Sequence, residues 1–159
     1  MSTAQQVTIG LATNADIAGL VASNEGLFAE DAAVRDHLRN PGWPAARGAE
    51  GLTKDLANPD RLVLAAKSDG LVVGHLIGGF QPASDMWLAP MAILITMHVG
   101  GAARGQGVGS RLMERFVSWG RERGAGQLRV TAYTANEAAV RFYQRHGFAP
   151  LETTLAMEV

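Results

Sequence analysis

The central segment of the chain reads Met97-His98-Val99-Gly100-Gly101-Ala102-Ala103-Arg104-Gly105-Gln106-Gly107-Val108-Gly109-Ser110. Its pattern predicts an apolar strand, a glycine-rich turn and the start of an amphipathic helix. Glycines let the backbone approach a ligand without an intervening Cβ, and a helix start offers unpaired N–H groups at the positive end of its dipole. We therefore expect the backbone amides of residues 106–110 to bind a phosphate or diphosphate.

Two common phosphate-binding motifs do not fit this spacing. A P-loop ends on Gly-Lys-Ser/Thr, whereas Gly109-Ser110-Arg111 supplies no lysine for β and γ phosphates. A dinucleotide fingerprint that begins at Gly105 and Gly107 requires a third glycine where Ser110 stands. That fingerprint also belongs near the start of a βαβ unit, whereas this turn lies two thirds of the way along the chain. The spacing therefore argues against a nucleotide triphosphatase and a dinucleotide-binding domain.

A second element lies downstream and reads Asn136-Glu137-Ala138-Ala139-Val140-Arg141-Phe142-Tyr143-Gln144-Arg145-His146-Gly147-Phe148. It resembles the Asn-x-x-Ala-x-x-Phe-Tyr-x-x-x-Gly-Phe block of the GNAT superfamily of N-acetyltransferases. The earlier Arg104-x-x-Gly107-x-Gly109 is similar to the element of that superfamily that marks acetyl-CoA binding. The resemblance is good over residues 60–159 and loose before them.

The resemblance implies an acetyl-CoA-dependent N-acetyltransferase with no metal, acting on a primary amine of a small molecule or a protein. It divides one domain, residues 1–159, into acceptor-side helices and loops (1–60) and a cofactor-binding core (61–159). The cofactor site that it implies has one part around the glycine turn and one part in the downstream helix. These residues are Met97, His98, Val99, Arg104, Gly105, Gln106, Gly107, Val108, Gly109, Ser110, Asn136, Ala139, Phe142 and Tyr143.

Most of these residues also have a purely structural interpretation. The glycines fit a tight turn, and Arg104 fits a solvated surface charge. Asn136 fits a helix cap, which is the better interpretation from local sequence alone. Phe142 and Tyr143 fit core aromatics, with the tyrosine hydroxyl at the surface. By resemblance, the Tyr143 hydroxyl faces the cofactor sulfur and protonates the departing thiolate as a general acid.

The implied chemistry also needs an oxyanion donor and a base. A backbone N–H near Val99 is the expected donor, since a splayed strand there leaves main-chain groups unpaired. In relatives the base often comes from the preceding strand, on the face that here carries the aliphatic Ile93 and Ile95. The base is therefore unassigned, and Asp85, His75, Glu30 and Asp31 are candidates.

Three side chains near this region have alternative interpretations. Strand parity turns His98 away from Ile93 and Ile95, which predicts a packed histidine unless a bulge changes the register. Glu30 and Asp31 fit a solvated helix face, or they bind the substrate by attracting a cationic amine into the acceptor cleft.

Composition narrows the function classes further. The chain has 159 residues, 47% of them hydrophobic and 18% charged, and a formal net charge of −1. These values describe one globular domain without a field for nucleic acid or membranes. With no cysteine, disulfides, thiolate metal sites and a cysteine nucleophile are excluded, so acyl transfer is direct or uses another nucleophile. No leader or membrane-spanning run is evident, so we expect a cytoplasmic protein.

The pattern of elements predicts an α/β fold, a GNAT-like mixed central β-sheet with helices on both faces. We expect strands over residues 7–11, 61–66, 71–80, 91–99 and 127–133, and a final strand or hairpin over 148–159. We expect helices from a cap at 13–16 to residue 28, over 29–42, from 108 to about 124 and over 136–146. A loop at 42–51, a short helical turn at 51–56, an Asp-Gly hairpin turn and a loop at 81–90 complete the prediction.

A non-catalytic acyl-CoA-binding module is the alternative function. Such a module would keep the phosphate site and lack the path for the proton, as the aliphatic Ile93 and Ile95 suggest. A tyrosine at position 143 favours the enzyme, because its hydroxyl is useful for chemistry at sulfur. Sheets of this type often pair, so a homodimer is a further expectation.

Overall fold

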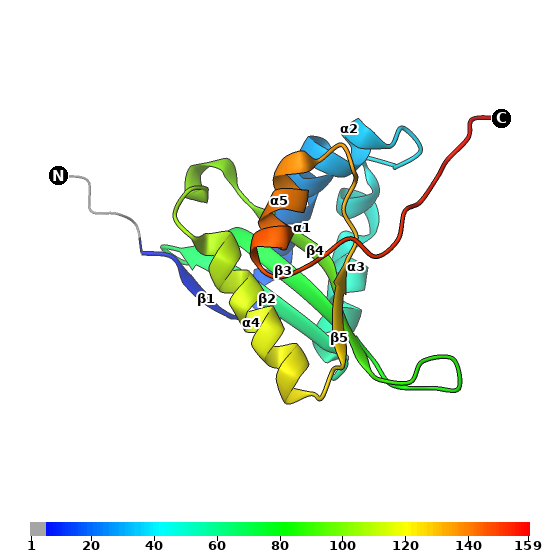
Figure 1. Cartoon of the computed structure of the whole chain (residues 1–159). Coiled ribbons are helices and arrows are strands. Elements are labelled where there is room, and N and C mark those ends of the chain that lie inside the picture. The colour runs from blue at the N-terminus through cyan, green and yellow to red at the C-terminus, as the bar shows by residue number, and fades with distance from the viewer. Residues whose placement is uncertain (1–5) are drawn as a thin grey trace.

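A five-stranded mixed sheet forms the centre of the computed structural model, which describes residues 6–159 (Figure 1). The strands follow one another in the order β1-β2-β3-β4-β5. The first four are antiparallel neighbours, and β5 is parallel to β4. Their bounds are β1 Thr8–Leu11, β2 Arg61–Ser68, β3 Leu71–Gln81, β4 Met91–Val99 and β5 Gln127–Val130. The predicted mixed sheet is confirmed.

Helices cover both faces of the sheet, as predicted. On one face α1 (Ile17–Leu27) and α3 (Trp43–Ala57) bury Leu20 and Leu52 against β2 and β3. On the other face α4 (Val108–Glu122) and α5 (Glu137–Arg145) pack over a larger core. Short helical segments are η1 (Asn14–Asp16), η2 (Phe28–Ala32), α2 (Ala33–Arg35) and η3 (Gly101–Ala103). No helix among residues 6–159 is long and apolar enough to cross a membrane.

The β2–β3 hairpin has the predicted Asp-Gly turn. Asp69 and Gly70 have φ angles of 50° and 78°, which are the left-handed conformations that a two-residue hairpin turn requires. The following strand, β3, carries Gly78 directly beneath the ring of Phe116 on α4, where a Cβ would approach the ring to 3.0 Å. This close approach fixes the position of α4 on the sheet. Because α4 begins directly after the glycine turn, the same packing also positions that turn.

Strand β4 separates from β5 halfway along its length. The two strands pair from Met91–Gln127 to Leu94–Val130. β5 ends at Val130, so the predicted strand over 127–133 is too long at its end, whereas β4 continues to Val99. Among residues 6–159, the carboxyl-terminal half of β4 therefore has no strand on its β5 side, which leaves a gap in the sheet at the level of the glycine turn.

A β-bulge at Ile95 reverses the facing of the residues that follow it. Ile77 pairs with Thr96 while Gly78 pairs with Leu94, so Ile95 is an extra residue in β4. As a result Thr96 and His98 lie on the same face as Ile93, toward α1. The simple parity prediction for His98 is therefore wrong, for the reason that it allowed for: a bulge shifts the register.

Three predicted segments differ from the structure. The predicted loop 42–51 is the first half of α3, because Pro44 occupies the first helical turn, where no N–H is needed. The predicted helix over 29–42 is η2 and α2 only, and it ends at Asp36, whose carboxylate accepts the Leu38 N–H at 3.0 Å.

The predicted final strand over 148–159 is also wrong. These residues have no regular structure in the chain as described, and they extend away from the sheet (Figure 1). Leu155 is 90% exposed and Met157 is 84% exposed. Their alternating apolar pattern is typical of a strand, but a strand needs a neighbour, and this segment pairs with no strand among residues 6–159.

Replacing Phe116 by Ala should lower the free energy of unfolding by about 3–5 kcal/mol, because the ring is fully buried and the deletion leaves a cavity over Gly78. Urea denaturation followed by circular dichroism measures this loss. Leu88→Ala is the control, since Leu88 is fully exposed and its truncation should cost less than about 0.5 kcal/mol. Equal stability of the two variants would contradict the packing described.

Candidate functional site

The glycine turn leaves five consecutive backbone amides without a partner. Gly105 and Gly107 have φ angles of 75° and 74°, so each occupies a conformation that other residues rarely adopt. Helix α4 starts at Val108, and its first hydrogen bond runs from the Arg111 N–H to the Gly107 carbonyl at 3.1 Å. The amides of residues 106–110 have no acceptor within residues 6–159. This is the arrangement expected of an anion site.

Gly109 joins the glycine turn to the other elements of the site. A Cβ at this position would lie 3.5 Å from the ring of Phe142 on α5 and 3.9 Å from the side chain of Val99 on β4. The first turn of α4 therefore contacts both the open end of β4 and the second sequence element. The two elements that the sequence singles out lie together in space.

The open half of β4 directs backbone groups into the gap beside β5. The Gly100 N–H donates to the Val73 carbonyl at 2.8 Å, so Val99, opposite Gly74, is in a non-hydrogen-bonded pair with β3. By the same alternation the N–H and carbonyl of Met97 and Val99 point away from β3. The Val99 carbonyl accepts from Arg104 Nε at 2.8 Å, and the Val99 N–H faces the gap.

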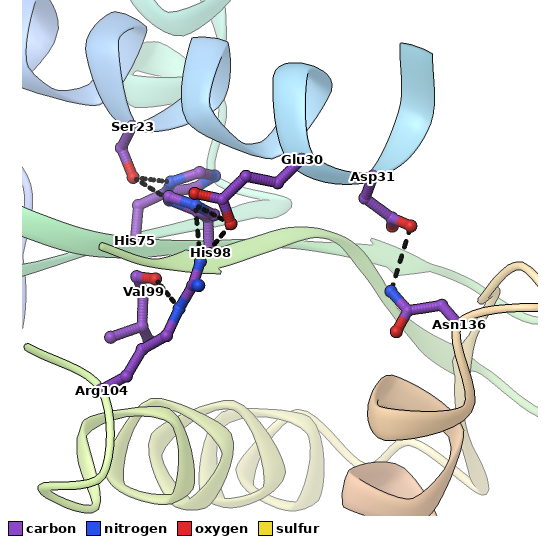
Figure 2. Close-up of polar contacts among 8 residues, drawn as sticks. All are labelled: Ser23, Glu30, Asp31, His75, His98, Val99, Arg104 and Asn136. Carbon is purple, nitrogen blue, oxygen red and sulfur yellow. Dashed lines mark hydrogen bonds and ion pairs between the residues drawn. The ribbon is translucent and has the colours of Figure 1, made fainter. Parts of the chain in front are cut away.

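Arg104 reaches from the glycine turn toward α1 and η2. Its guanidinium forms an ion pair with Glu30 and lies 3.4 Å from His98 Nε2 (Figure 2). The side chain is thus more than a free surface charge: it links the acceptor-side segment to the glycine turn. The hydrogen bond from Arg104, with smaller contributions from His98, holds the pKa of Glu30 below its usual range against the opposing effect of burial.

The π-helical turn η2 aims two neighbouring carboxylates at the site. Its widened turn, closed by the Ala33 N–H on the Phe28 carbonyl, lets consecutive side chains face the sheet. Figure 2 shows Glu30 directed at His98 and Arg104, and Asp31 directed at Asn136. Glu30 and Asp31 therefore lie over the open end of β4 and beside the start of α5, respectively. π-Helical turns are frequent at functional sites.

Asn136 caps helix α5, as its local sequence predicts. Its Oδ1 accepts the Ala139 N–H at 3.2 Å, and its Nδ2 donates to Asp31 Oδ1 at 3.0 Å. Asp31 also pairs with Arg35 at 2.5 Å. The cap fixes η2 relative to α5, and so it sets the position of Tyr143 against Asp31.

Tyr143 is half-buried between two aromatic rings. The ring of Phe142 is 5.5 Å away and that of Phe148 is 6.0 Å away, both in edge-to-face contact. Burial, together with the negative charge of Asp31, raises the pKa of Tyr143 to about 12. The phenol therefore keeps its proton at neutral pH and acts as a hydrogen-bond donor.

His75 does not reach a cleft. It is 1% exposed, with Nδ1 2.6 Å from Ser23 Oγ and Nε2 3.1 Å from Thr96 Oγ1. Burial, with a smaller effect of the charge on His98, lowers the pKa of His75 to about 3. As a base for an amine His75 is therefore ruled out, because both ring nitrogens are occupied inside the protein.

Asp85 lies far from the other candidates. It is exposed in the loop between β3 and β4, at the opposite end of β4 from Val99, a separation of about 25 Å for a strand of nine residues. Figure 1 shows this loop, in green, projecting beyond the sheet. The structure thus argues against Asp85 as the base. A cavity of about 350 Å³ lies between these ends, lined in part by Ile93, Ile95 and Arg61.

Sequence reasoning missed Ser23, which lies on α1 and contacts both His75 and His98. A serine in an amphipathic helix gives no signal of its own. Only the bulge at Ile95, which turns His98 toward α1, makes the connection visible.

Comparison with known proteins agrees with this geometry. Residues 31–148 match the model of the acetyltransferase (GNAT) family. A streptothricin acetyltransferase from Streptomyces lavendulae is 32% identical over 102 residues, 64% of this chain and 49% of that protein. An uncharacterized N-acetyltransferase from Mycobacterium tuberculosis is 29% identical over 140 residues, 86% of this chain and 83% of that protein. The chain thus spans about half of the first relative and most of the second.

Solved structures share the fold over nearly the whole chain. A transcriptional regulator from Bacillus halodurans superposes with a TM-score of 0.77 at 26% identity, covering 97% of this chain and 100% of that one. An aminoglycoside N-acetyltransferase solved with CoA superposes with a TM-score of 0.76 at 15% identity, covering 100% of this chain and 98% of that one. The family model covers well over half of the chain, and the chain therefore belongs to the acetyltransferase (GNAT) family.

Proposed function

We propose that the protein transfers the acetyl group of acetyl-CoA to a primary amine, which attacks the thioester directly. The observation that carries the proposal is the row of unpartnered amides at residues 106–110, next to the gap where β4 leaves β5. The diphosphate of CoA would accept hydrogen bonds from these amides. The extended, amide-containing arm of CoA would form hydrogen bonds with the outward backbone groups of Met97 and Val99. No cysteine is available for an acyl-enzyme, which supports direct attack.

Acetyl-CoA supplies an activated acetyl thioester when it is bound. The residues proposed to hold it fit its chemistry, since the turn offers N–H donors to a doubly charged group and Gly109 leaves room between Phe142 and Val99. Ala139 and Phe142 on α5 form the proposed wall for the arm, and the cap at Asn136 orients that wall.

The Val99 N–H is proposed to stabilise negative charge that develops on the acetyl oxygen. It points into the gap, away from β3, and no strand competes for it on that side. The Tyr143 hydroxyl is proposed to donate a hydrogen bond to the departing thiolate. A phenol with a pKa of about 12 is a weaker acid than an ordinary thiol, so this donation lowers the barrier mainly by stabilising charge.

The acceptor is proposed to be a cationic small-molecule amine. Glu30 and Asp31 bring two carboxylates to the mouth of the gap, and they attract a protonated amine. The relatives named above include a streptothricin acetyltransferase and an aminoglycoside N-acetyltransferase, which supports a small molecule over a protein amine. A screen of amines that includes lysine peptides separates the two acceptor classes.

A non-catalytic acyl-CoA-binding module is the competing function. It predicts tight binding of acetyl-CoA with no thiol release on any amine. The proposed enzyme predicts thiol release that depends on the amine and on Tyr143.

Gly107→Asp should weaken CoA binding by at least about 100-fold, because a carboxylate at the turn repels the diphosphate at a cost of several kcal/mol. A Cβ at residue 107 meets no atom within 4 Å, but the φ of 74° strains any side chain at this position, so the effect of charge has to be separated from that of backbone strain. Gly107→Asn, of the same shape without the charge, is the matched control and should bind more tightly than Gly107→Asp. Calorimetry measures both, and wild-type affinity in folded Gly107→Asp would refute the proposed site.

Tyr143→Phe should lower kcat by about 100-fold or more while CoA affinity stays unchanged, because only the hydroxyl is removed and the ring contacts remain. Release of the CoA thiol over time, at saturating acetyl-CoA and amine, gives kcat. The chain has one other tyrosine, Tyr133, and Tyr133→Phe should leave kcat unchanged. Full turnover by Tyr143→Phe would remove Tyr143 from the chemistry.

We also propose that two copies associate, with the apolar segment 151–159 of one copy covering the outer edge of β5 in the other. Within the described part of the chain, β5 pairs with a strand on one side only, and Leu151, Leu155 and Met157 are exposed on the segment. Light scattering during size-exclusion chromatography should give a dimer for the wild type and a monomer for Leu155→Lys/Met157→Lys. Leu88→Lys is the control, and a wild-type monomer would contradict the association.

A further inference from the structure

An attacking amine must lose its proton, and the stretch of β4 around Ile93 and Ile95 has no group to accept it. We propose that His98 accepts this proton, with Glu30 stabilising the imidazolium that forms. The inference rests on the proposed acetyl transfer, and it assigns the base that the sequence left open.

The bulge and helix α1 together fix the His98 ring. The extra residue at position 95 turns His98 toward α1, where the ring lies against Gly26. A Cβ at residue 26 would lie 2.7 Å from His98 Cε1, so only glycine leaves room for the ring. The His98 side chain is only 9% exposed. The Nε2 edge of its ring is directed at Glu30 and Arg104.

His98 Nε2 faces the two charged groups at the mouth of the gap. It lies 3.4 Å from Glu30 Oε2 and 3.4 Å from Arg104 Nη2 (Figure 2). The Glu30 and Arg104 side chains are each about half exposed. A proton on Nε2 thus has a carboxylate partner, and that carboxylate is open to solvent, where the proton is finally released.

A buried chain of hydrogen bonds supports the opposite edge of the ring. His98 Nδ1 lies 3.4 Å from Ser23 Oγ, which lies 2.6 Å from His75 Nδ1, while His75 Nε2 lies 3.1 Å from Thr96 Oγ1. Both hydroxyls can rotate, so the chain can run in either direction. In one direction Ser23 accepts from His98 Nδ1–H and donates to His75, and in the other it donates to His98.

This reversibility suits a group that changes its protonation state. When His98 is an imidazolium, Nδ1–H donates to Ser23 and Nε2–H donates to Glu30, so both donors are satisfied. When His98 is neutral with a lone pair on Nε2, the Ser23 bond is unchanged and Arg104 can donate to Nε2. His75 stays neutral in both states, because burial lowers its pKa to about 3. The ring nitrogens of His98 and His75 therefore keep their partners in both states.

The charges around His98 set its basicity. Burial lowers the pKa of His98, the Glu30 carboxylate on η2 opposes that shift, and Arg104 from the glycine turn adds to it. A further titratable neighbour, His75 on β3, is uncharged at neutral pH. The pKa of His98 lies below the usual 6.5, so at neutral pH the imidazole is unprotonated and competent as a base.

The proton balance of the step is simple. The ammonium N–H of the acceptor gives its proton to His98 Nε2, and the freed nitrogen lone pair forms the bond to the acetyl carbon. As the C–S bond breaks, the electron pair leaves on sulfur, with the Tyr143 hydroxyl as donor, and the nitrogen gives its second proton to water, which leaves the neutral amide. The imidazolium then returns to neutral through Glu30 and water, and the thiolate takes a proton from solvent.

The kinetic test compares two amines in wild type and His98→Gln. One is the fastest alkylamine of the acceptor panel with a β-methyl group, and the other is its β,β,β-trifluorinated analogue, because three fluorines lower the ammonium pKa enough to leave the amine mostly neutral at pH 7. His98→Gln should lower kcat/KM for the alkylamine by about 100-fold or more and for the fluorinated amine by far less. His37→Gln is the control, since His37 is exposed and pairs only with Glu158 at 3.5 Å.

The second test reads the histidine itself by NMR, without turnover. The chain has four histidines, so single substitutions assign every imidazole signal. The titration midpoint of His98 should lie below pH 6.5. In Glu30→Gln, the His98 midpoint and the acidic limb of the kcat/KM profile should both move to lower pH, because the carboxylate that favours the imidazolium is lost. The Glu30 side chain is about half exposed, so this variant should keep the wild-type fold.

Three outcomes would overturn the inference. The first is an equal loss of kcat/KM on both amines in His98→Gln, which assigns a structural role to the side chain. The second is no loss of kcat/KM in His98→Gln, and the third is a His98 titration midpoint that Glu30→Gln leaves unchanged. Each of these leaves acetyl transfer itself intact as long as the wild type turns over. Failure of the wild type on every amine would instead overturn the proposed function, and with it this assignment.

Discussion

The separation of β4 from β5 after the Leu94–Val130 pair is the constraint on which the site depends. A strand in the middle of a sheet satisfies its backbone groups on both sides, and β4 gives up one side over its last five residues. The amides at the start of α4 are left open at the same level. Polar backbone groups from two elements therefore face one gap, and an extended ligand with a charged end can satisfy both.

Two one-residue irregularities direct the side chains of this region. The bulge at Ile95 turns Thr96 and His98 toward α1, and the π-helical turn η2 presents Glu30 and Asp31 to the sheet on neighbouring positions. Without the bulge, His98 would point into the core beneath α4. Regular structure therefore supplies the framework, and the departures from regularity bring the charged and titratable groups together.

Much of the fold followed from local patterns. The Asp69-Gly70 turn, the apolar strand β4 and the stripe of α4 are each specified by a few adjacent residues. The start of α3 was missed because Trp43-Pro44 resembles a loop, whereas Pro44 lies at the helix start. The segment 148–159 was overpredicted because its alternation is typical of a strand, although strand formation depends on a partner.

The candidate site was predictable where a motif carries the chemistry within a few residues. The glycine turn and the Asn136 cap are such cases. The contacts of Glu30 with Arg104 and of Ser23 with His98 join residues that are 74 and 75 positions apart, and they depend on the bulge and on the π-helical turn. Neither irregularity leaves a mark in the periodicity of the sequence, so this part of the site required the structure.

The most direct test of the central claim is a titration of ¹⁵N-labelled protein with CoA, followed by amide NMR. We expect the largest shifts on the amides of residues 106–110, with further shifts at Met97 and Val99 on the open side of β4. Shifts confined to another surface, with the amides of 106–110 unmoved at saturation, would contradict it.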